Sequence, residues 1–250
     1  MFRYFIELAY RGRNYAGFQI QQNANSVQEE VEKALLVFYR QAYELTGSSR
    51  TDAGVNALQN FFHVDIPVDH KQPVEADCYR LNAILPDDIV IRSIRPVKPE
   101  AHCRFGAMER QYRYGIYKSK DPFLEDRSYY YPYQLDMGLM ESAAAMIMEY
   151  RDFTSFSKRN TQVKSFICEL SESRWYVEGD QLYYTVRGNR FLRGMVRGLV
   201  GTMLQVGRGK LSLDEFRDII EQKDCTRADF AVPGHGLFLI KVSFPDDLYI

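Results

Sequence analysis

The sequence predicts an α+β protein with a mainly antiparallel sheet. Strand-like alternation and helix-like periodicity succeed one another along the 250 residues, and each half of the chain has them in a similar order. Neighbouring strand patterns are spaced as in hairpins, which favours antiparallel pairing. No Pro/Gly-rich linker divides the chain, so we expect two similar sheet-plus-helices halves, 1–105 and 106–250, that share one sheet.

The N-terminal half contains five predicted elements. In chain order these are a strand at 2–10, a helix at 26–40, a strand at 59–66, a helix at 74–84 and a strand at 89–97. The helix at 26–40 has the clearest signature, because Ser26 and Glu29 form a capping box and apolar residues recur on one helical face.

The C-terminal half contains seven predicted elements. They are a strand at 109–117, a helix at 137–149, strands at 164–177 and 181–190, helices at 191–205 and 212–222, and a strand at 237–244. The helix at 191–205 is unusual because Gly194, Gly198 and Gly201 recur at helical spacing. Each glycine costs about 1 kcal/mol relative to alanine in a helix interior. We therefore expect a strand, a partner or a ligand to approach this helix closely. Arg193 and Arg197 are expected to share one of its faces.

Composition indicates a soluble, cytoplasmic protein. Hydrophobic residues make up 46% and charged residues 26% of the chain, which is ordinary for a globular protein. No apolar run approaches the roughly 20 residues needed to cross a bilayer, so we expect no membrane association. The first residues enter a strand pattern directly and lack the regions of a signal peptide.

Several classes of site are not indicated. The cysteines are scattered, without C-x-x-C pairs, and are expected to be apolar core residues; they are Cys78, Cys103, Cys168 and Cys225. No His/Cys spacing is typical of zinc, and no Walker, dinucleotide-binding or serine-hydrolase motif occurs. We therefore expect neither a metal nor a nucleotide cofactor.

Basic residues are concentrated although the net charge is only −1. One stretch without intervening acids contains Arg187, Arg190, Arg193, Arg197, Arg208 and Lys210, and a second contains Lys158, Arg159 and Lys164. Such a stripe is typical of a surface that binds a polyanion. A solvated charged face explains it equally well, so both interpretations stay open on charge alone.

Two segments contain residues suited to chemistry on RNA. Asp52 lies in a tight polar turn within Gly47–Val55, just before a strand. It is either a nucleophile or a residue that closes the turn through a backbone hydrogen bond. In the strand at 109–117, Tyr112 and Tyr114 alternate with basic residues, as stacking on bases and contact with phosphates require.

The chain resembles the tRNA pseudouridine synthase family over nearly its whole length. The motifs that carry the resemblance are Tyr10-Arg-Gly, Tyr15-Ala-Gly-Phe-Gln19 and Gln21, Ser26-Val-Gln28, Arg50-Thr-Asp-Ala-Gly-Val55, His102-Cys-Arg-Phe105, Arg110-Gln-Tyr-Arg-Tyr114, Asp152-Phe-Thr-Ser-Phe156, Asn189-Arg-Phe-Leu192, Met195-Val-Arg197 with Val200-Gly201, Val206-Gly207 and Pro233 through Leu237. The order of so many motifs makes the resemblance specific and favours catalysis by Asp52.

The resemblance implies a reaction and three catalytic residues. Family members detach uracil from C1′ of ribose, turn it and reattach it through C5, without a redox cofactor or a metal. Asp52 would be the nucleophile, attacking either C1′ or the uracil ring. Arg197 would pair with Asp52, and Tyr112 would stack on the target uracil and is a candidate to take the C5 proton.

The resemblance also implies an RNA interface and an assembly. Arg50 would help to fill the space left by the flipped base, and segments 101–105 and 160–164 match places where the family touches RNA. The expected RNA-binding residues are Arg50, His102, Arg104, Lys158, Arg159, Lys164, Arg190 and Arg193. The substrate would be the 3′ side of the anticodon arm of tRNA, bound by a homodimer with a basic active-site cleft between the halves of each monomer. The N-terminal half would carry the Asp loop, and the C-terminal half the Tyr strand and the Arg helix.

Some residues depart from the family pattern. Asn56 stands where histidine is usual and Gly198 where asparagine is usual, while Cys103 replaces alanine and Arg11 replaces aspartate. These departures allow the same chemistry at other tRNA uridines. A non-catalytic tRNA-binding module is a second alternative, although it would not need Asp52. A glycosidase would want a second acid, and none is evident near Asp52.

Overall fold

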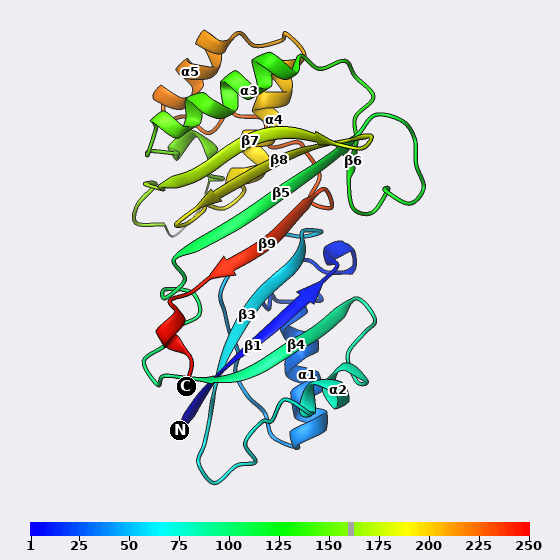
Figure 1. Cartoon of the computed structure of the whole chain (residues 1–250), viewed down its shortest axis with the longest axis vertical. Helices are drawn as coiled ribbons and strands as arrows, with labels where there is room; N and C mark the ends of the chain where they lie inside the picture. The colour runs from blue at the N-terminus through cyan, green and yellow to red at the C-terminus, as the bar shows by residue number, and fades with distance from the viewer. Residues whose placement is uncertain (160–162) are drawn as a thin grey trace. The chain divides into compact units, whose positions relative to one another are not determined.

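The structure is a computed structural model that describes residues 1–159 and 163–250. The chain has the predicted α+β class, with a mixed, mostly antiparallel sheet. It divides into two compact units, one of Met1–Met108 with Leu239–Ile250 and the other of Glu109–Phe238. Figure 1 labels the elements of both units.

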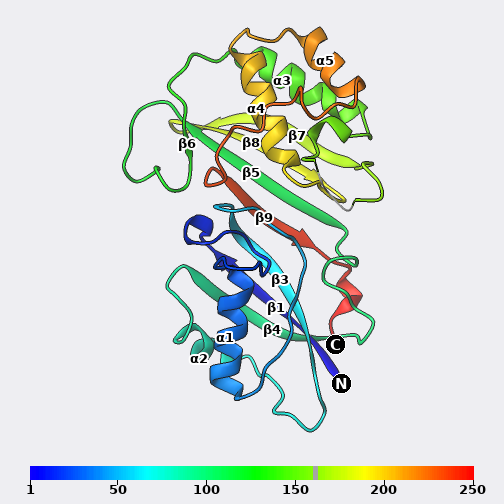
Figure 2. The same cartoon turned by 180° about the vertical axis from the view of Figure 1, so that it is seen from behind.

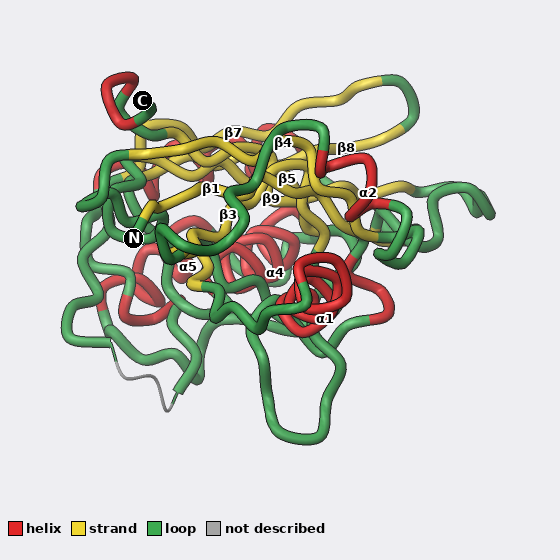
Figure 3. Tube along the Cα trace, turned by 90° about the horizontal axis from the view of Figure 1, so that it is seen from below, coloured by secondary structure: helices red, strands yellow, loops and turns green. Residues whose placement is uncertain are grey.

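The first unit is built on β1. This strand (Phe2–Tyr10) pairs antiparallel with both β3 (Asn56–Ile66) and β4 (Ile89–Val97), and Phe5 lies opposite His63 and Arg95. The short β2 (Thr46–Gly47) pairs with β3. The remaining elements are η1 (Gly12–Asn14), α1 (Val27–Tyr39), α2 (Asp77–Asn82) and η4 (Asp246–Leu248). Helix α1 lies on one face of β1 and β3 (Figures 2 and 3).

Stacked rings fill the first unit's core beside β2. Phe18, which is almost fully buried, lies with its ring centroid 4.4 Å from that of Phe62 and 5.6 Å from that of Tyr10. A Cβ at Gly47 would lie 2.4 Å from the Phe18 ring, so only glycine fits there. This packing ties the segment around Phe18 to the turn that follows β2.

The second unit is built on β8. This strand (Gln181–Gly188) pairs antiparallel with β5 (Glu109–Tyr117) and β7 (Leu170–Glu178), and β6 (Tyr129–Tyr130) pairs parallel with β5. The helices are α3 (Met137–Met146), η2 (Ile147–Glu149), η3 (Thr154–Phe156), α4 (Met195–Gly207) and α5 (Leu213–Glu221). The chain passes from this unit back to the first within β9 (Leu237–Ser243).

Two predicted boundaries differ from the structure by four residues or more. The strand expected from 164 begins at Leu170, because the preceding residues bond to another segment: Phe153 N–H donates to Phe166 O at 3.1 Å and Cys168 N–H to Arg151 O at 2.8 Å. The helix expected from 191 begins at Met195, since Gly194 adopts a left-handed φ of +74° at its N-cap. Gly194 is therefore not in the helix interior.

The close approach expected at α4 is confirmed at the other two glycines. A Cβ at Gly201 would lie 2.1 Å from the carbonyl oxygen of Asp229, and one at Gly198 would lie 2.7 Å from the ring of Phe230. The approaching group is the irregular segment at 229–230 of the same unit rather than a strand. The small residues of α4 thus let this segment pack against the helix.

The cysteines and the helices bear on the expectations drawn from composition. The four cysteines are free, and three of them are buried. Among the described residues, no helix combines the length and apolar character needed to cross a membrane.

Candidate active site

Asp52 lies in the turn that joins β2 to β3. It pairs with Gly17 in an isolated antiparallel bridge, and its carbonyl oxygen accepts Val55 N–H at 3.2 Å. Gly54 has a φ of +74°, which closes the turn at little steric cost. The bridge and the turn bond fix the backbone of Asp52, and the residue as a whole is half-buried.

Asn56 fixes the other end of this turn. Its Oδ1 accepts the backbone N–H of Gly12 at 2.9 Å, and the residue is 2% exposed. A Cβ at Gly12 would lie 2.1 Å from the carbonyl oxygen of Val55, so glycine is required for the approach. The residue that departs from the family pattern therefore has a structural role here, joining the turn after β1 to the Asp52 turn.

Arg197 lies in the first turn of α4. Its Nε donates to the carbonyl oxygen of Val232 at 2.8 Å, and Nη2 donates to that of Phe230 at 3.3 Å. The irregular segment that packs on Gly198 and Gly201 thus also orients this guanidinium. Arg193 precedes the helix, so the expectation that Arg193 and Arg197 share one helical face is wrong.

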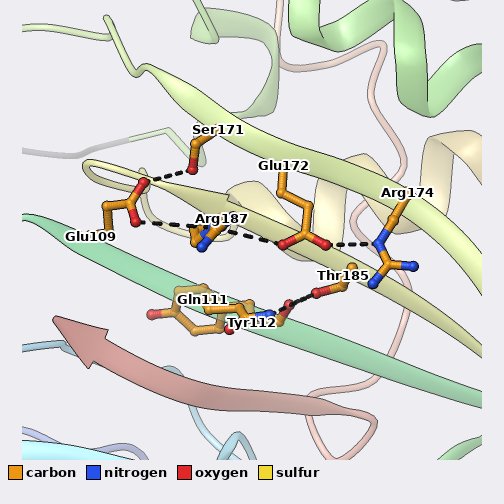
Figure 4. A network of polar contacts seen from close by, with 8 residues as sticks. All are labelled: Glu109, Gln111, Tyr112, Ser171, Glu172, Arg174, Thr185 and Arg187. Atoms are coloured by element: carbon orange, nitrogen blue, oxygen red, sulfur yellow. Dashed lines mark hydrogen bonds and ion pairs between the residues drawn. The ribbon is translucent and has the colours of Figure 1, made fainter.

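Tyr112 lies on β5 opposite Val186 of β8. Its side chain is buried, and its ring meets that of Phe191 edge-on with centroids 5.1 Å apart. Its carbonyl oxygen accepts from Thr185 Oγ1 at 3.4 Å (Figure 4). Tyr114, by contrast, is fully buried and donates to Pro233 O at 2.8 Å, so the expectation that it stacks on a base is wrong.

Figure 4 also draws a network of charged and polar side chains on β5, β7 and β8. Ser171 Oγ donates to Glu109 at 2.6 Å, Arg174 Nε donates to Glu172 at 2.7 Å, and Arg187 lies 3.7 Å from Glu172. These side chains are partly exposed, and such pairs contribute only about 0–1 kcal/mol each. The network joins β5, β7 and β8, which form the framework that holds Tyr112.

Three of the expected RNA-binding residues line one pocket in the first unit. Arg50, His102 and Arg104 surround a volume of about 300 Å³ together with Phe105. The guanidinium of Arg104 lies 5.6 Å from the centre of the Phe105 ring, and the His102 and Phe105 rings are 4.4 Å apart. Phe105 is 78% exposed. Residues about 50 positions apart in the sequence thus form a cationic, aromatic surface.

A second basic pocket lies in the other unit. Lys158 and Arg159 line a volume of about 280 Å³ with Lys223 and Cys225. Lys158 N–H donates to Arg193 O at 3.0 Å, which joins the basic run that contains Lys158 and Arg159 to Arg193, two residues before α4 begins.

The other two expected RNA-binding residues of this unit lie elsewhere. Lys164 is exposed and Arg190 is half-buried. Burial raises the pKa of the Cys168 thiol to about 11, against the opposing effect of the nearby Arg190 charge. Positions 160–162 of the expected RNA-contacting segment lie outside the described residues.

One group of side chains in the described part of the chain could hold a metal ion. Ligand atoms of His63, His102 and Cys103 all lie within 4.8 Å of one another. Hydrogen bonds already engage these atoms, however: Cys103 Sγ donates to Thr46 O at 3.0 Å, and His63 Nδ1 lies 3.2 Å from the same sulfur. These hydrogen bonds account for the close approach of Cys103 to His63.

The family follows from comparison with known proteins. A model described as tRNA pseudouridine synthase matches residues 143–245. The whole chain is 44% identical to tRNA pseudouridine synthase A of Parabacteroides distasonis, an alignment that covers 100% of this chain and 98% of that protein. The chain belongs to the tRNA pseudouridine synthase family.

Other tRNA pseudouridine synthases are similar over the same span. The enzyme named tRNA pseudouridine synthase A in Porphyromonas gingivalis is 45% identical, with 100% of both chains covered. The protein of that name in Staphylococcus aureus is 36% identical, with 96% of this chain and 90% of the relative covered. Similarity thus extends beyond the segment that the family model matches and includes the Asp52 turn.

Proposed function

We propose that this protein isomerises uridine to pseudouridine in the anticodon stem-loop of tRNA. The observation that carries the proposal is the full-length similarity to proteins named tRNA pseudouridine synthase A. The reaction breaks the bond between N1 of uracil and C1′ and forms a bond between C5 and C1′. A proton leaves C5 and N1 is protonated, so the reaction needs no net oxidant or reductant.

In this proposal Asp52 is the nucleophile. A carboxylate must be ionised and correctly directed to attack C1′ or the uracil ring. The bridge to Gly17 and the bonds that hold Thr51 and Val55 support this role, because they fix the backbone on both sides of Asp52. The side chain remains half-buried rather than part of the core.

Arg197 and Tyr112 are proposed to complete the catalytic set. Arg197 would favour the charged form of Asp52, and the carbonyl oxygens of Val232 and Phe230 support this role by holding its guanidinium in one orientation. Tyr112 would stack on the extruded uracil and take the C5 proton. Its fixed place between β8 and the Phe191 ring supports a rigid stacking surface.

The RNA surface is proposed to include both basic pockets. The first pocket has the volume of a small ligand site and combines guanidinium, imidazole and phenyl groups, which suits stacking on bases and contact with phosphates. The second supplies Lys158 and Arg159. The basic residues Lys164, Arg190 and Arg193 do not line this pocket, and they would extend the RNA surface beyond it.

The family resemblance supports the rest of the proposal. The active form would be a cytoplasmic homodimer without a metal or nucleotide cofactor, in which tRNA contacts both subunits. Each monomer would have a basic active-site cleft between halves 1–105 and 106–250.

Pseudouridine mapping tests the function directly. Purified protein is incubated with unmodified tRNA transcripts, and pseudouridine is located by chemical labelling and primer extension. We expect product on the 3′ side of the anticodon arm. Product at other positions would favour the alternative that this protein modifies different uridines, and tight tRNA binding without any product would favour a non-catalytic module.

A further inference from the structure

A buried polar network lies beneath the residues that precede Asp52. Its members are Tyr10, Ser49, Thr51 and Asn60, and each is less than a tenth exposed to solvent. Burial of polar groups is unfavourable unless they are hydrogen-bonded. Apolar side chains could fill this part of the core without needing hydrogen-bond partners. The presence of four polar residues here therefore suggests a role other than filling the core.

Asn60 holds the backbone of Ser49 from both sides. Ser49 N–H donates to Asn60 Oδ1 at 3.3 Å, and Asn60 Nδ2 donates to the carbonyl oxygen of Ser49 at 2.9 Å. Nδ2 also donates to the hydroxyl of Tyr10 at 3.1 Å. A primary amide has two N–H donors, so both are used. The Asn60 amide thus gives Ser49 the pair of backbone hydrogen bonds that a neighbouring strand would otherwise provide.

Tyr10 carries the constraint to the residue next to Asp52. Its hydroxyl lies 2.7 Å from Thr51 Oγ1, and the carbonyl oxygen of Thr51 accepts Phe18 N–H at 3.1 Å. Thr51 is thus held through both its side chain and its backbone. The orientation of the Asp52 side chain is consequently set by Tyr10 on β1 and Asn60 on β3, which belong to the same compact unit as Asp52.

We propose that Asn60 and Tyr10 are positioning residues for the Asp52 carboxylate. They act through Ser49 and Thr51 rather than on the substrate, and the inference rests on the proposed function of Asp52. A displacement of about 1 Å at a reacting group can lower a rate by about 10²-fold. The network therefore maintains the geometry of attack and contributes little to tRNA binding.

The variant Tyr10→Phe tests this role with the smallest change. It removes one oxygen and keeps the ring that stacks on Phe18. We expect kcat for pseudouridine formation to fall by about tenfold or more, while KM for tRNA stays within about twofold. The matched control is Tyr4→Phe on the same strand, because the Tyr4 hydroxyl bonds to Gln72 at 3.1 Å, away from the loop. The control should keep the parent kcat.

Asn60→Ala provides a second test with its own control. Asn82 holds the backbone of Ile91 as Asn60 holds Ser49, with both bonds at 2.8 Å. Both variants lose a pair of hydrogen bonds to one backbone residue, and Asn60→Ala also loses the bond to the Tyr10 hydroxyl; only Asn60→Ala should lower kcat. Thr51→Val should also lower kcat. Thr51→Ser keeps the hydroxyl, so this variant should have the parent kcat.

The outcomes separate this inference from the proposed function. A parent protein that forms no pseudouridine defeats the proposed function itself. An active parent whose Tyr10→Phe and Thr51→Val variants keep the parent kcat overturns the positioning role alone. Equal losses of kcat in Tyr10→Phe and Tyr4→Phe would also overturn it, because they would indicate general destabilisation. If Asn60→Ala fails to fold, the tyrosine and threonine variants decide the question.

Discussion

Arg197 donates from Nε to the carbonyl oxygen of Val232 at 2.8 Å. The bond joins the first turn of α4 to an irregular segment that also packs on Gly198 and Gly201. Nη2 of Arg197 also donates to the carbonyl oxygen of Phe230. A lysine cannot reproduce this pair of bonds, since its ammonium lacks the planar fork of a guanidinium.

Arg197→Lys is therefore expected to lose most activity. We predict that the single-turnover rate of pseudouridine formation falls by about 100-fold, the scale of a misplaced catalytic group, while tRNA affinity changes little. Arg174→Lys is the control, because Arg174 is an exposed side chain that contacts its own strand, through Glu172 and the Tyr176 ring. A parent-like rate for Arg197→Lys would show that the orientation of this guanidinium does not matter.

The glycines of α4 should differ in their tolerance of alanine. Gly201→Ala places a Cβ against the rigid backbone of Asp229, so overpacking of about 1–3 kcal/mol should exceed the gain in helix propensity. Gly138→Ala in α3 is the control, because its Cβ would meet only the Asp136 carboxylate at 3.4 Å. Urea unfolding should show a less stable Gly201→Ala and a control that is unchanged or more stable. Equal stability of the two variants would contradict the close approach.

Stability should decline in mild acid because of His63. Burial, aided by the charges of Arg3 and His102, lowers the pKa of His63 from 6.5 to about 4. Between these values the unfolded chain binds a proton that the folded protein does not. The free energy of unfolding should therefore fall as the pH drops from about 6.5 to 4, by at most a few kcal/mol at about 1.4 kcal/mol per pKa unit.

Urea unfolding at several pH values measures this effect. His63→Gln should remove part of the slope between pH 6.5 and 4. The Asp65 carboxylate, whose pKa is lowered by its bond to Arg3, adds its own loss only at lower pH. An unchanged slope in the variant would show that His63 is not the responsible group.

The pocket lined by Arg50 and Arg104 should contribute to the salt dependence of tRNA binding. Removing one arginine that binds a phosphate should reduce the slope of log K against log salt by about 0.7–0.9. We expect Arg50→Ala and Arg104→Ala each to weaken tRNA binding and flatten the slope by roughly that amount. Lys33→Ala is the control, since Lys33 is paired with Glu29 and Glu30 on α1. A parent-like slope in both arginine variants would exclude phosphate binding there.

Local sequence patterns were sufficient for most elements. The strands at 2–10 and 109–117 have the expected bounds. In the second strand burial alternates over the first six residues, as a two-residue period in the sequence predicts. The short β2 and β6 were missed, since two residues carry no period. The start of β7 depended on backbone bonds to residues 151–153, which local periodicity cannot reveal.

The candidate site was only partly accessible from sequence. Motif order identified Asp52, Arg197 and Tyr112 as candidates, and the roles of all three remain proposals. The partners of Asn60 and Asn56 could not be predicted, because a polar residue in a strand pattern does not indicate which backbone group it binds. The grouping of Arg50 with Arg104 likewise depends on tertiary packing across about 50 residues.

Asp52→Asn tests the central claim most directly. The substitution keeps the size of the side chain and removes the charge that nucleophilic attack requires. Pseudouridine formation should be measured in unmodified tRNA with parent and variant at matched concentrations, together with tRNA affinity. We predict parent-like binding and no product above background for the variant. Turnover near the parent rate would contradict the assignment of Asp52 as the nucleophile.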